Sequence, residues 1–347
     1  MNVAVRINGR APAWPVLVES EHPLYAPYSS ESLASVSYSI LANEGKRSEN
    51  RLWEVLIDAG HNSTPYIIQN GNRIPEAIVL THAHNDHVLG VDWIVQSYHY
   101  KHKKTKRYPL YSTKGVWKDF LKLFPYLKHA IEHIELIPGK KTAIKEVGKI
   151  DVTAFPVYHG KNSKGASMLF FEGEGFHPVI ITGDMLCPLL RKKDYHSISR
   201  ASAMFVDSNN RFPDPFSNHA SFVHHIADQE DYAQKLLDWF KKMSIQQLIA
   251  PHNKNESDKA ILNYFEDFSK DWQEISELPH TILDFNEYLN IPEVYLMHYF
   301  GYYDKINYNE DLLDSQSLEN WANLVAKEKH MKKVVYKVPK VGDLIYL

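Results

Sequence analysis

The chain has little cysteine and no long apolar run. Cys187 is the single cysteine among 347 residues, which excludes an intrachain disulfide framework and a metal site built from several thiolates. No stretch reaches the roughly 18 apolar residues that a membrane helix needs. The N-terminal residues also lack the apolar segment of a secretory signal. We therefore expect a cytoplasmic protein with no membrane partner.

An excess of charge of one sign is also missing. The formal net charge is −3 at pH 7, so the field of the whole molecule favours neither an anionic nor a cationic partner. The chain has no internal repeat and no low-complexity linker. Its apolar fraction of 44% supports a full core, and its length suits one large domain with an addition.

Short β-type runs alternate with amphipathic helical runs, a pattern typical of an α/β fold. The composition shifts near residue 255, after which tyrosine, asparagine and leucine dominate. We predict a catalytic domain over 1–255 and a C-terminal extension over 256–347. The extension would serve as a lid or as the dimerisation element of a homodimer. Its aromatic residues would stack on a base or pack in a core, and packing is the favoured alternative.

Histidine is abundant, with 19 copies, and several apolar runs end in histidine or aspartate. The five runs that end in this way are LIDAG, IVLTHAH, FPVYHG, IITGD and LIAPHN. Binding sites in α/β layers form at the carboxyl ends of strands. The pattern therefore predicts that five strand ends meet at one site.

The segment THAHNDH, residues 81–87, carries the densest group of metal-binding side chains. Extended residues two apart point to the same side, so His82 and His84 can share one ion. Asp86 and His87 begin the next helix and can reach a second ion. Imidazole and carboxylate ligands suit zinc and related ions, and a pair of ions suits hydrolysis. The alternative, a loop of surface histidines, fits poorly directly after the buried run AIVL.

This segment resembles the H-x-H-x-D-H signature of the metallo-β-lactamase superfamily. The family pattern continues in order through LIDAG, VYHG, ITGDM and APHN, so the resemblance covers about residues 35–255. It implies a four-layer αββα sandwich, followed here by a mainly helical C-terminal extension. It also implies that Asp58 braces the ligand loop by hydrogen bonds without binding metal.

The resemblance further implies two divalent metal ions, with zinc the first choice and manganese or iron the alternatives. The first ion would be bound by His82, His84 and His159, the second by Asp86, His87 and His252, and Asp184 would bridge them. An aspartate at the bridging position is usual in branches that act on phosphodiesters, thioesters and lactones.

The layout from His159 to Asp184 resembles the branch that contains tRNase Z and small cyclic phosphodiesterases. This interval is too short for a tRNA-gripping arm, so tRNA is not the expected substrate. NHASF would place His219 near the scissile phosphate, where it can protonate the leaving oxygen; the alternative is a surface histidine in a turn. The basic run at 101–107 could steer a phosphate, although a solvated loop is the simpler interpretation.

We therefore predict a dinuclear metal-dependent hydrolase that attacks a small-molecule phosphodiester, such as a cyclic nucleotide, through a metal-bridging hydroxide. The predicted catalytic residues are Asp86, Asp184 and His219. One alternative is a thioesterase or lactonase of the same fold, similar to glyoxalase II. The other is a non-catalytic, ligand-binding member of the family, against which the complete set of ligands argues.

Overall fold

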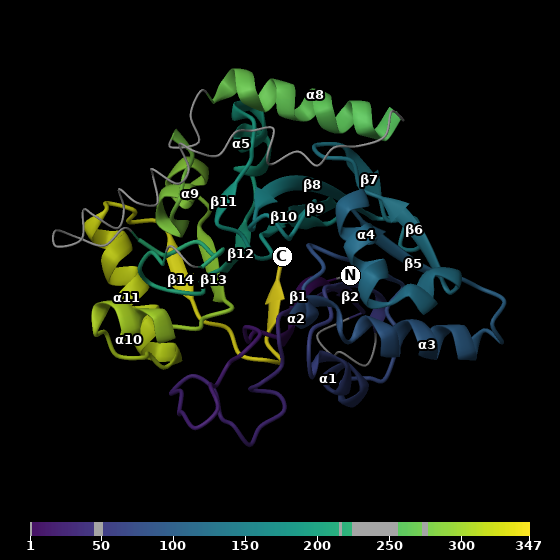
Figure 1. Cartoon of the computed structure of the whole chain (residues 1–347), viewed down its shortest axis with the longest axis horizontal. Coiled ribbons are helices and arrows are strands. Elements are labelled where there is room, and N and C mark those ends of the chain that lie inside the picture. The colour runs from purple at the N-terminus through teal and green to yellow at the C-terminus, as the bar shows by residue number, and fades with distance from the viewer. Residues whose placement is uncertain (1, 45–50, 215–216, 224–255, 273–276) are drawn as a thin grey trace.

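The computed structural model describes residues 2–44, 51–214, 217–223, 256–272 and 277–347. Two β-sheets pack face to face, and helices cover both outer faces (Figure 1). The predicted four-layer sandwich is therefore confirmed, including a C-terminal part that is largely helical. Among the described helices, none is long and apolar enough to cross a membrane.

The first sheet has seven strands in the order β15-β1-β2-β3-β4-β5-β6. Its strands are β1 (Asn2–Gly9), β2 (Ser37–Asn43), β3 (Arg51–Ile57), β4 (Ala77–Val79), β5 (Tyr108–Ser112), β6 (Ile131–Glu135) and β15 (Leu344–Tyr346). From β3 to β6 all strands are parallel. The carboxyl ends of β3 and β4 therefore lie at one edge, where Asp58 and the segment 81–87 follow.

The second sheet has eight strands, in the order β11-β8-β9-β10-β12-β13-β14 with β7 paired to β8. Its strands are β7 (Lys141–Ala143), β8 (Ile150–Tyr158), β9 (Ser167–Gly173), β10 (Phe176–Ile181), β11 (Cys187–Pro188), β12 (Ala203–Asp207), β13 (Glu293–Met297) and β14 (Val335–Lys337). Strands β9 and β10 pair as an antiparallel hairpin. Strands β10, β12 and β13 are parallel, so their carboxyl ends share an edge.

Three apolar cores separate the layers. Along each inner strand, side chains point alternately into the core between the sheets and into the core beneath the helices. In β4, Ala77 and Val79 face the core between the sheets, whereas Ile78 faces the core beneath the first group of helices. In β12, Phe205 faces the central core and Met204 faces the other helical layer. Burial of each large apolar side chain contributes about 1.5–3 kcal/mol. Such strands are apolar on both faces, as their sequences predict.

Two groups of helices cover the sheets. The first sheet carries α1 (Ser63–Gln69), α2 (Asn85–Val88), α3 (Val91–Lys101), α4 (Lys114–Leu123) and the short helix η2 (Pro125–His129). The second sheet carries α5 (Lys192–Ile198), α8 (Glu256–Asp271), α9 (Ile282–Leu289), α10 (Tyr302–Tyr308) and α11 (Ser315–Glu328). In Figure 1 these groups lie on opposite sides of the sheets.

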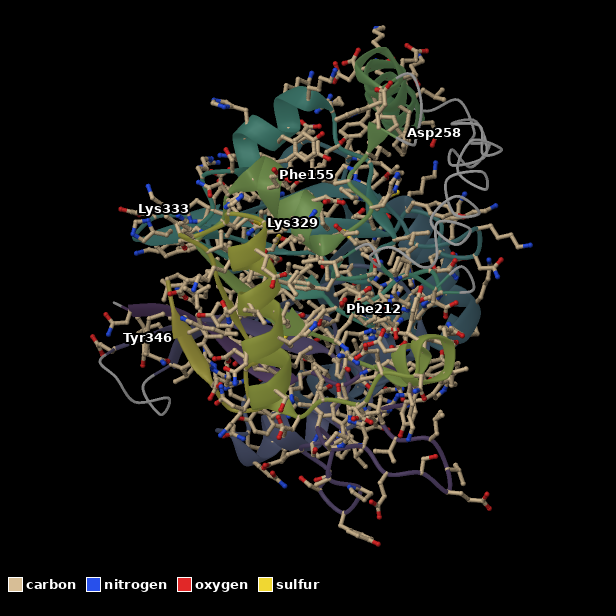
Figure 2. All side chains as sticks on the ribbon, turned by 90° about the vertical axis from the view of Figure 1, so that its left-hand side faces the viewer. Phe155, Phe212, Asp258, Lys329, Lys333 and Tyr346 are labelled. Atoms are coloured by element: carbon tan, nitrogen blue, oxygen red, sulfur yellow. The ribbon has the colours of Figure 1, made fainter. Side chains whose placement is uncertain are left out.

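The segment after residue 255 adds strands to both sheets as well as helices. Strand β13 pairs with β12, β14 pairs with β13, and β15 pairs with β1. Figure 2 shows these C-terminal elements facing the viewer, with Lys329 directly after α11 and Tyr346 in β15. The boundary at 255 stays a prediction, but strands from both sides of it form shared sheets.

The helix that the sequence predicts to begin at Asp86 is divided in two. Helix α2 ends at Val88, and α3 begins at Val91. The division falls at Gly90, where a Cβ atom would lie 2.6 Å from Thr64 Oγ1. Gly90 N also donates a hydrogen bond to Ala59 O at 2.7 Å. This close approach of two backbone segments holds the region that follows segment 81–87 against the residues after β3.

Candidate metal centre

The carboxyl ends of strands from both sheets meet at one edge of the sandwich. Strand β4 is followed by His82, His84, Asp86 and His87, and β8 is followed by His159. Strand β10 is followed by the turn that carries Asp184. All these side chains except His84 are buried. The structure thus brings together every predicted ligand that it describes.

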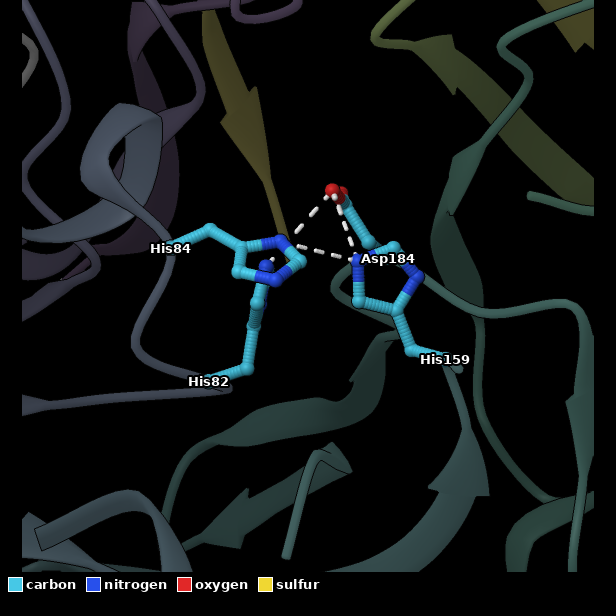
Figure 3. A group of neighbouring side chains, drawn as sticks. All are labelled: His82, His84, His159 and Asp184. Carbon is cyan, nitrogen blue, oxygen red and sulfur yellow. Dashed lines mark hydrogen bonds and ion pairs between the residues drawn. The ribbon is translucent and has the colours of Figure 1, made fainter. Parts of the chain in front are cut away.

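The first group consists of His82, His84, His159 and Asp184, whose ligand atoms all lie within 4.8 Å of one another (Figure 3). Asp184 Oδ2 lies 3.6 Å from His82 Nε2 and 3.7 Å from His159 Nε2. His159 Nε2 lies 3.1 Å from His84 Nδ1. Three imidazoles and one carboxylate therefore point at a common centre, as the sequence predicts for the first ion.

The second group consists of Asp86, His87, Asp184 and His298, again within 4.8 Å of one another. His87 Nε2 lies 3.2 Å from Asp184 Oδ1, and His298 Nε2 lies 3.2 Å from Asp86 Oδ2. Asp184 belongs to both groups, with its two oxygens turned to different histidines. Asp184 is thus the residue that the two groups share, and its bridging of two ions stays a prediction.

His298 was not among the predicted ligands. His252, which the sequence assigned to the second ion, lies outside the described residues, and its role stays a prediction. His298 follows β13, whose Met297 pairs with Asp207 at the end of β12. The run VYLMH carries the same signal as the others, an apolar strand that ends in histidine. Its place beyond the expected domain boundary concealed it.

Asp58 holds the ligand segment in place from the end of β3. Its carboxylate accepts hydrogen bonds from Thr81 N at 2.9 Å and Thr81 Oγ1 at 2.6 Å. It also accepts one from His87 Nδ1 at 2.8 Å. With Nδ1 protonated in this way, Nε2 of His87 presents its lone pair to the cluster. The bracing role implied for Asp58 agrees with these contacts.

A third group, formed by Asp184, Asp207, His219 and His298, adjoins the first two. Of these residues the sequence predicted Asp184 and His219. Asp207, at the end of β12, accepts a hydrogen bond from His219 Nδ1 at 2.6 Å. Its other oxygen lies 3.5 Å from His298 Nδ1. His219 lies 3.9 Å from Asp184 Oδ2 and is only partly buried. One buried carboxylate therefore orients two imidazoles, and neither Asp207 nor its role was predicted.

The donors fit divalent metal ions. Nε2 of His82 and Nε2 of His87 are buried and have no hydrogen-bond partner in the part of the chain that the structure describes. A buried polar atom without a partner costs free energy, and metal coordination would satisfy both nitrogens. The remaining donors are imidazole nitrogens and carboxylate oxygens, the types that zinc, manganese and iron accept.

Electrostatics divide the histidines into two kinds. Burial lowers the pKa of His159 to about 3, with the neighbouring His219 acting in the same direction. Burial likewise lowers the pKa of His82. These imidazoles are neutral near pH 7, the form that binds metal.

Burial opposes a charge on His219 too, but Asp207 and Asp184 outweigh it and raise its pKa. Neighbouring carboxylates raise the pKa of His87 in the same way, and they raise that of His298 to about 10. A bound cation would oppose a proton on these two candidate ligands, whereas His219 lies beside the two ligand groups and is suited to carry one.

The groups open into a cavity of about 720 Å³. Its polar wall includes His84, Asp86, His159, Asp184, His219 and His298. Another part of the wall is apolar and is formed by Pro12, Ala13, Trp14, Leu123, Phe300 and Tyr303. The basic run at 101–107 does not line this cavity, which favours its interpretation as a solvated loop.

Comparison with known families and structures agrees with this geometry. A model of the β-lactamase superfamily domain matches residues 54–252, more than half of the chain. The chain therefore belongs to the metallo-β-lactamase superfamily, as the motifs predicted. No curated protein sequence matches the chain at a significant level.

Three solved structures have a similar fold. A diphosphatase from the PhnP family has a TM-score of 0.60 at 12% identity, covering 99% of this chain and 98% of its own. Yeast PDE1 has a TM-score of 0.52 at 10% identity, with coverage of 100% and 99%. The short form of human tRNase Z has a TM-score of 0.50 at 12% identity, with coverage of 99% and 98%. At such identities the likeness shows the fold alone.

Proposed function

We propose that this chain is a dinuclear metal-dependent phosphodiesterase that hydrolyses a small phosphodiester, such as a cyclic or linear nucleotide. The observation that carries the proposal is the arrangement of two ligand groups that share Asp184, with the His219–Asp207 pair directly beside them. Two ions, with zinc the first choice, suit hydrolysis, and a protonated imidazole beside them suits a poor alkoxide leaving group.

Each of the two ligand groups would hold one metal ion. The first ion would be held by His82, His84, His159 and Asp184, and the second by Asp86, His87, Asp184 and His298. When bound, the ions supply an activated water near neutral pH and neutralise charge on the phosphoryl oxygens. Ser163 Oγ, 2.8 Å from His84 Nε2, would orient that imidazole from outside the ligand group.

His219 would act as the general acid. Its Nδ1–H donates to Asp207, which leaves Nε2–H as the proton that can be given away. Asp207 holds the ring in one orientation and stabilises its charged form. His219 lines the cavity, so the leaving oxygen of a bound ester can reach it. This pair favours an alkoxide leaving group over the thiolate of a thioester, which departs without a proton.

Two of the similar structures support a reaction at phosphorus. They are a protein described as a diphosphatase and yeast PDE1. A diphosphate bond is also cleaved by attack on phosphorus, so both reactions suit this arrangement of ligands. The alternatives of a thioesterase, a lactonase or a non-catalytic binding protein become outcomes of the test below.

The test uses the full-length protein loaded with Zn²⁺ or Mn²⁺ and three substrates: bis-p-nitrophenyl phosphate, a thioester and a lactone. We expect turnover of the phosphodiester that is lost on chelation and restored by added metal. His84→Ala and Asp86→Ala each remove a candidate ligand. In both variants we expect metal affinity and turnover to fall by more than the roughly 10–100-fold that loss of an outer hydrogen-bond partner costs. Circular dichroism should stay close to that of the wild type.

The matched control is His196→Ala, which changes an exposed histidine on α5 and should leave both measurements unchanged. Undiminished turnover by the chelated protein would contradict the metal mechanism. Faster turnover of the thioester or lactone would assign the carboxyl-derivative alternative, and metal binding with no turnover of any ester would assign the binding protein.

A further inference from the structure

The apolar wall of the cavity contains an unusually exposed tryptophan. Trp14 is 67% exposed although it lines the same cavity as Asp184 and His219. Single exposed apolar side chains are common on protein surfaces. A tryptophan held at the mouth of a cavity with a reactive centre is a different case, because a ligand there would cover its ring.

The loop that carries Trp14 is held rigidly. Pro12 and Pro15 flank the residue and fix their own φ angles, and Trp14 is further restricted because it precedes a proline. Just before this segment, Arg10 O accepts a hydrogen bond from His298 N at 2.9 Å. The backbone just before the Trp14 loop is therefore hydrogen-bonded to the strand end that carries His298.

The far end of the loop is also attached near the centre. Tyr302 Oη accepts a hydrogen bond from Leu17 N at 3.4 Å and donates one to Glu21 O at 3.2 Å. Tyr302 stands four residues after His298. A loop whose backbone is restrained in advance loses less conformational entropy when a ligand binds to it.

Further aromatic surface continues the wall. Phe300 and Tyr303 line the cavity, and their ring centroids lie 5.4 Å apart. Both follow His298 closely in sequence, so the aromatic surface and the metal centre share one support. Among the aromatic residues of the C-terminal extension, Tyr295, Tyr299, Phe300 and Tyr302 are buried, as the packing alternative predicted.

The described wall of the cavity offers little positive charge. Its lysine, Lys122, donates a hydrogen bond to the carboxylate of Asp119 at 2.5 Å, and none of the described lining residues is an arginine. Polyanionic ligands such as nucleic acids and nucleoside polyphosphates are bound through several cationic side chains. The wall therefore suits a ligand whose charge is confined to the phosphate at the metal centre.

We propose that Trp14 is a specificity residue on which the nucleobase of the substrate stacks, and that the substrate class is a mononucleotide phosphodiester. This proposal rests on the proposed phosphodiesterase activity and narrows it. A cavity of about 720 Å³ lies within the range of small-ligand sites, roughly 300–1,000 Å³. Phosphate binds at the metal centre, and the base covers the indole.

The test compares two esters with the same leaving group and the same scissile bond. Thymidine 5′-(p-nitrophenyl phosphate) carries a base, and methyl p-nitrophenyl phosphate does not. For metal-loaded Trp14→Ala we expect kcat/KM to fall about tenfold or more on the thymidine ester, mainly through KM, because stacking on one aromatic ring contributes binding of that order. The methyl ester should change by less than about twofold. Trp14→Phe should recover most of the loss.

The matched control is Trp93→Ala, which removes another exposed tryptophan, 53% accessible, that does not line the cavity. Its kinetics on both esters should equal those of the wild type. If Trp14→Ala lowers both esters equally, or neither, the stacking role is wrong while the phosphodiesterase activity stands. If the loaded wild type hydrolyses neither ester, the proposed function fails, and the specificity proposal fails with it.

Discussion

Asp207 illustrates how a single carboxylate can organise the imidazoles of a candidate metal centre. Its Oδ1 accepts a hydrogen bond from Asn209 N at 3.1 Å, and its Oδ2 accepts one from Met185 N at 3.2 Å. These bonds fix the carboxylate from the backbone. The same two oxygens then face the Nδ1 atoms of His219 and His298. The hydrogen bond to Asp207 sets the tautomer of His219 and the direction of its Nε2 atom. His298 Nδ1 lies 3.5 Å from Asp207 Oδ1 and 3.2 Å from Asn209 Nδ2.

Asp207→Asn should therefore impair catalysis with little change in substrate binding. On a phosphodiester with an alkoxide leaving group, such as a cyclic nucleotide, we expect kcat to fall about 10²–10⁴-fold while KM stays within a few fold, because the amide cannot stabilise charged His219 or enforce its tautomer. A p-nitrophenyl ester, whose phenolate departs without a proton, should be affected much less. Since Asp207 and Asp184 together raise the pKa of His219, loss of one charge lowers it. A general acid works only below its pKa, so the alkaline limb of the kcat profile should move to lower pH.

The measurements are steady-state kinetics across pH and the metal content of the variant. If His298 binds metal, affinity should also fall about 10–100-fold, the usual effect of losing an outer hydrogen-bond partner. A variant with wild-type kcat, pH profile and metal content would show that Asp207 serves only the stability of the strand end.

The sequence located most of the residues of the centre but not all of them. His82, His84, Asp86 and His87 are contiguous, so their spacing alone indicated a shared site. His298 and Asp207 stand alone in sequence, and each is an ordinary polar residue after an apolar run. Only the pairing of β12 with β13 brings them to the cluster. Spacing carries information over a few residues, whereas strand pairing acts over any distance.

Among the elements, the turn between β10 and Asp184 shows how backbone geometry positions the bridging ligand. Gly183 has φ +58°, and a Cβ atom there would lie 2.6 Å from Thr81 Cβ. Thr81 Oγ1 in turn donates a hydrogen bond to Asp58 Oδ2. The turn after β10 thus packs directly on the residue that begins the ligand segment, which joins the two sheets at the centre.

Gly183→Ala should lower the free energy of unfolding by about 2–4 kcal/mol, from the left-handed conformation and the displaced threonine together. It should also lower metal affinity, because Asp184 follows immediately. The matched control is Gly148→Ala, with a similar φ of +71° but no atom within 4 Å of the added Cβ. It should cost about 1–2 kcal/mol and leave metal affinity unchanged.

Chemical denaturation and metal titration of the two variants measure these effects. Equal destabilisation by both substitutions would mean that the contact with Thr81 adds nothing to backbone strain. Unchanged metal affinity in Gly183→Ala would mean that this turn does not set the position of Asp184.

In the molecule as a whole, the segment after residue 255 completes the sandwich. It supplies strands to both sheets and apolar side chains such as Phe268, Phe285 and Ala322 to the core beneath the second sheet. It also supplies His298. If the segment were removed, β12 would lose its partner strand β13, and the second sheet would lose a large part of the helical layer that covers it.

A chain that ends at residue 255 should therefore fail to unfold cooperatively. Loss of a single buried phenylalanine side chain costs about 3–5 kcal/mol, and whole domains have only about 5–15 kcal/mol of stability. Circular dichroism during thermal unfolding and the yield of soluble protein measure the outcome. A cooperative transition with retained metal binding would instead support the predicted domain over 1–255.

The sequence by itself determined the strand and helix pattern, the family and the contiguous metal ligands, because alternation, spacing and local motifs are properties of neighbouring residues. Tertiary structure alone decided which distant strand ends meet: it added His298 and Asp207 to the centre, joined the C-terminal segment to both sheets and set Trp14 at the cavity. The physical reason is that parallel strands align their carboxyl ends whatever the length of chain between them.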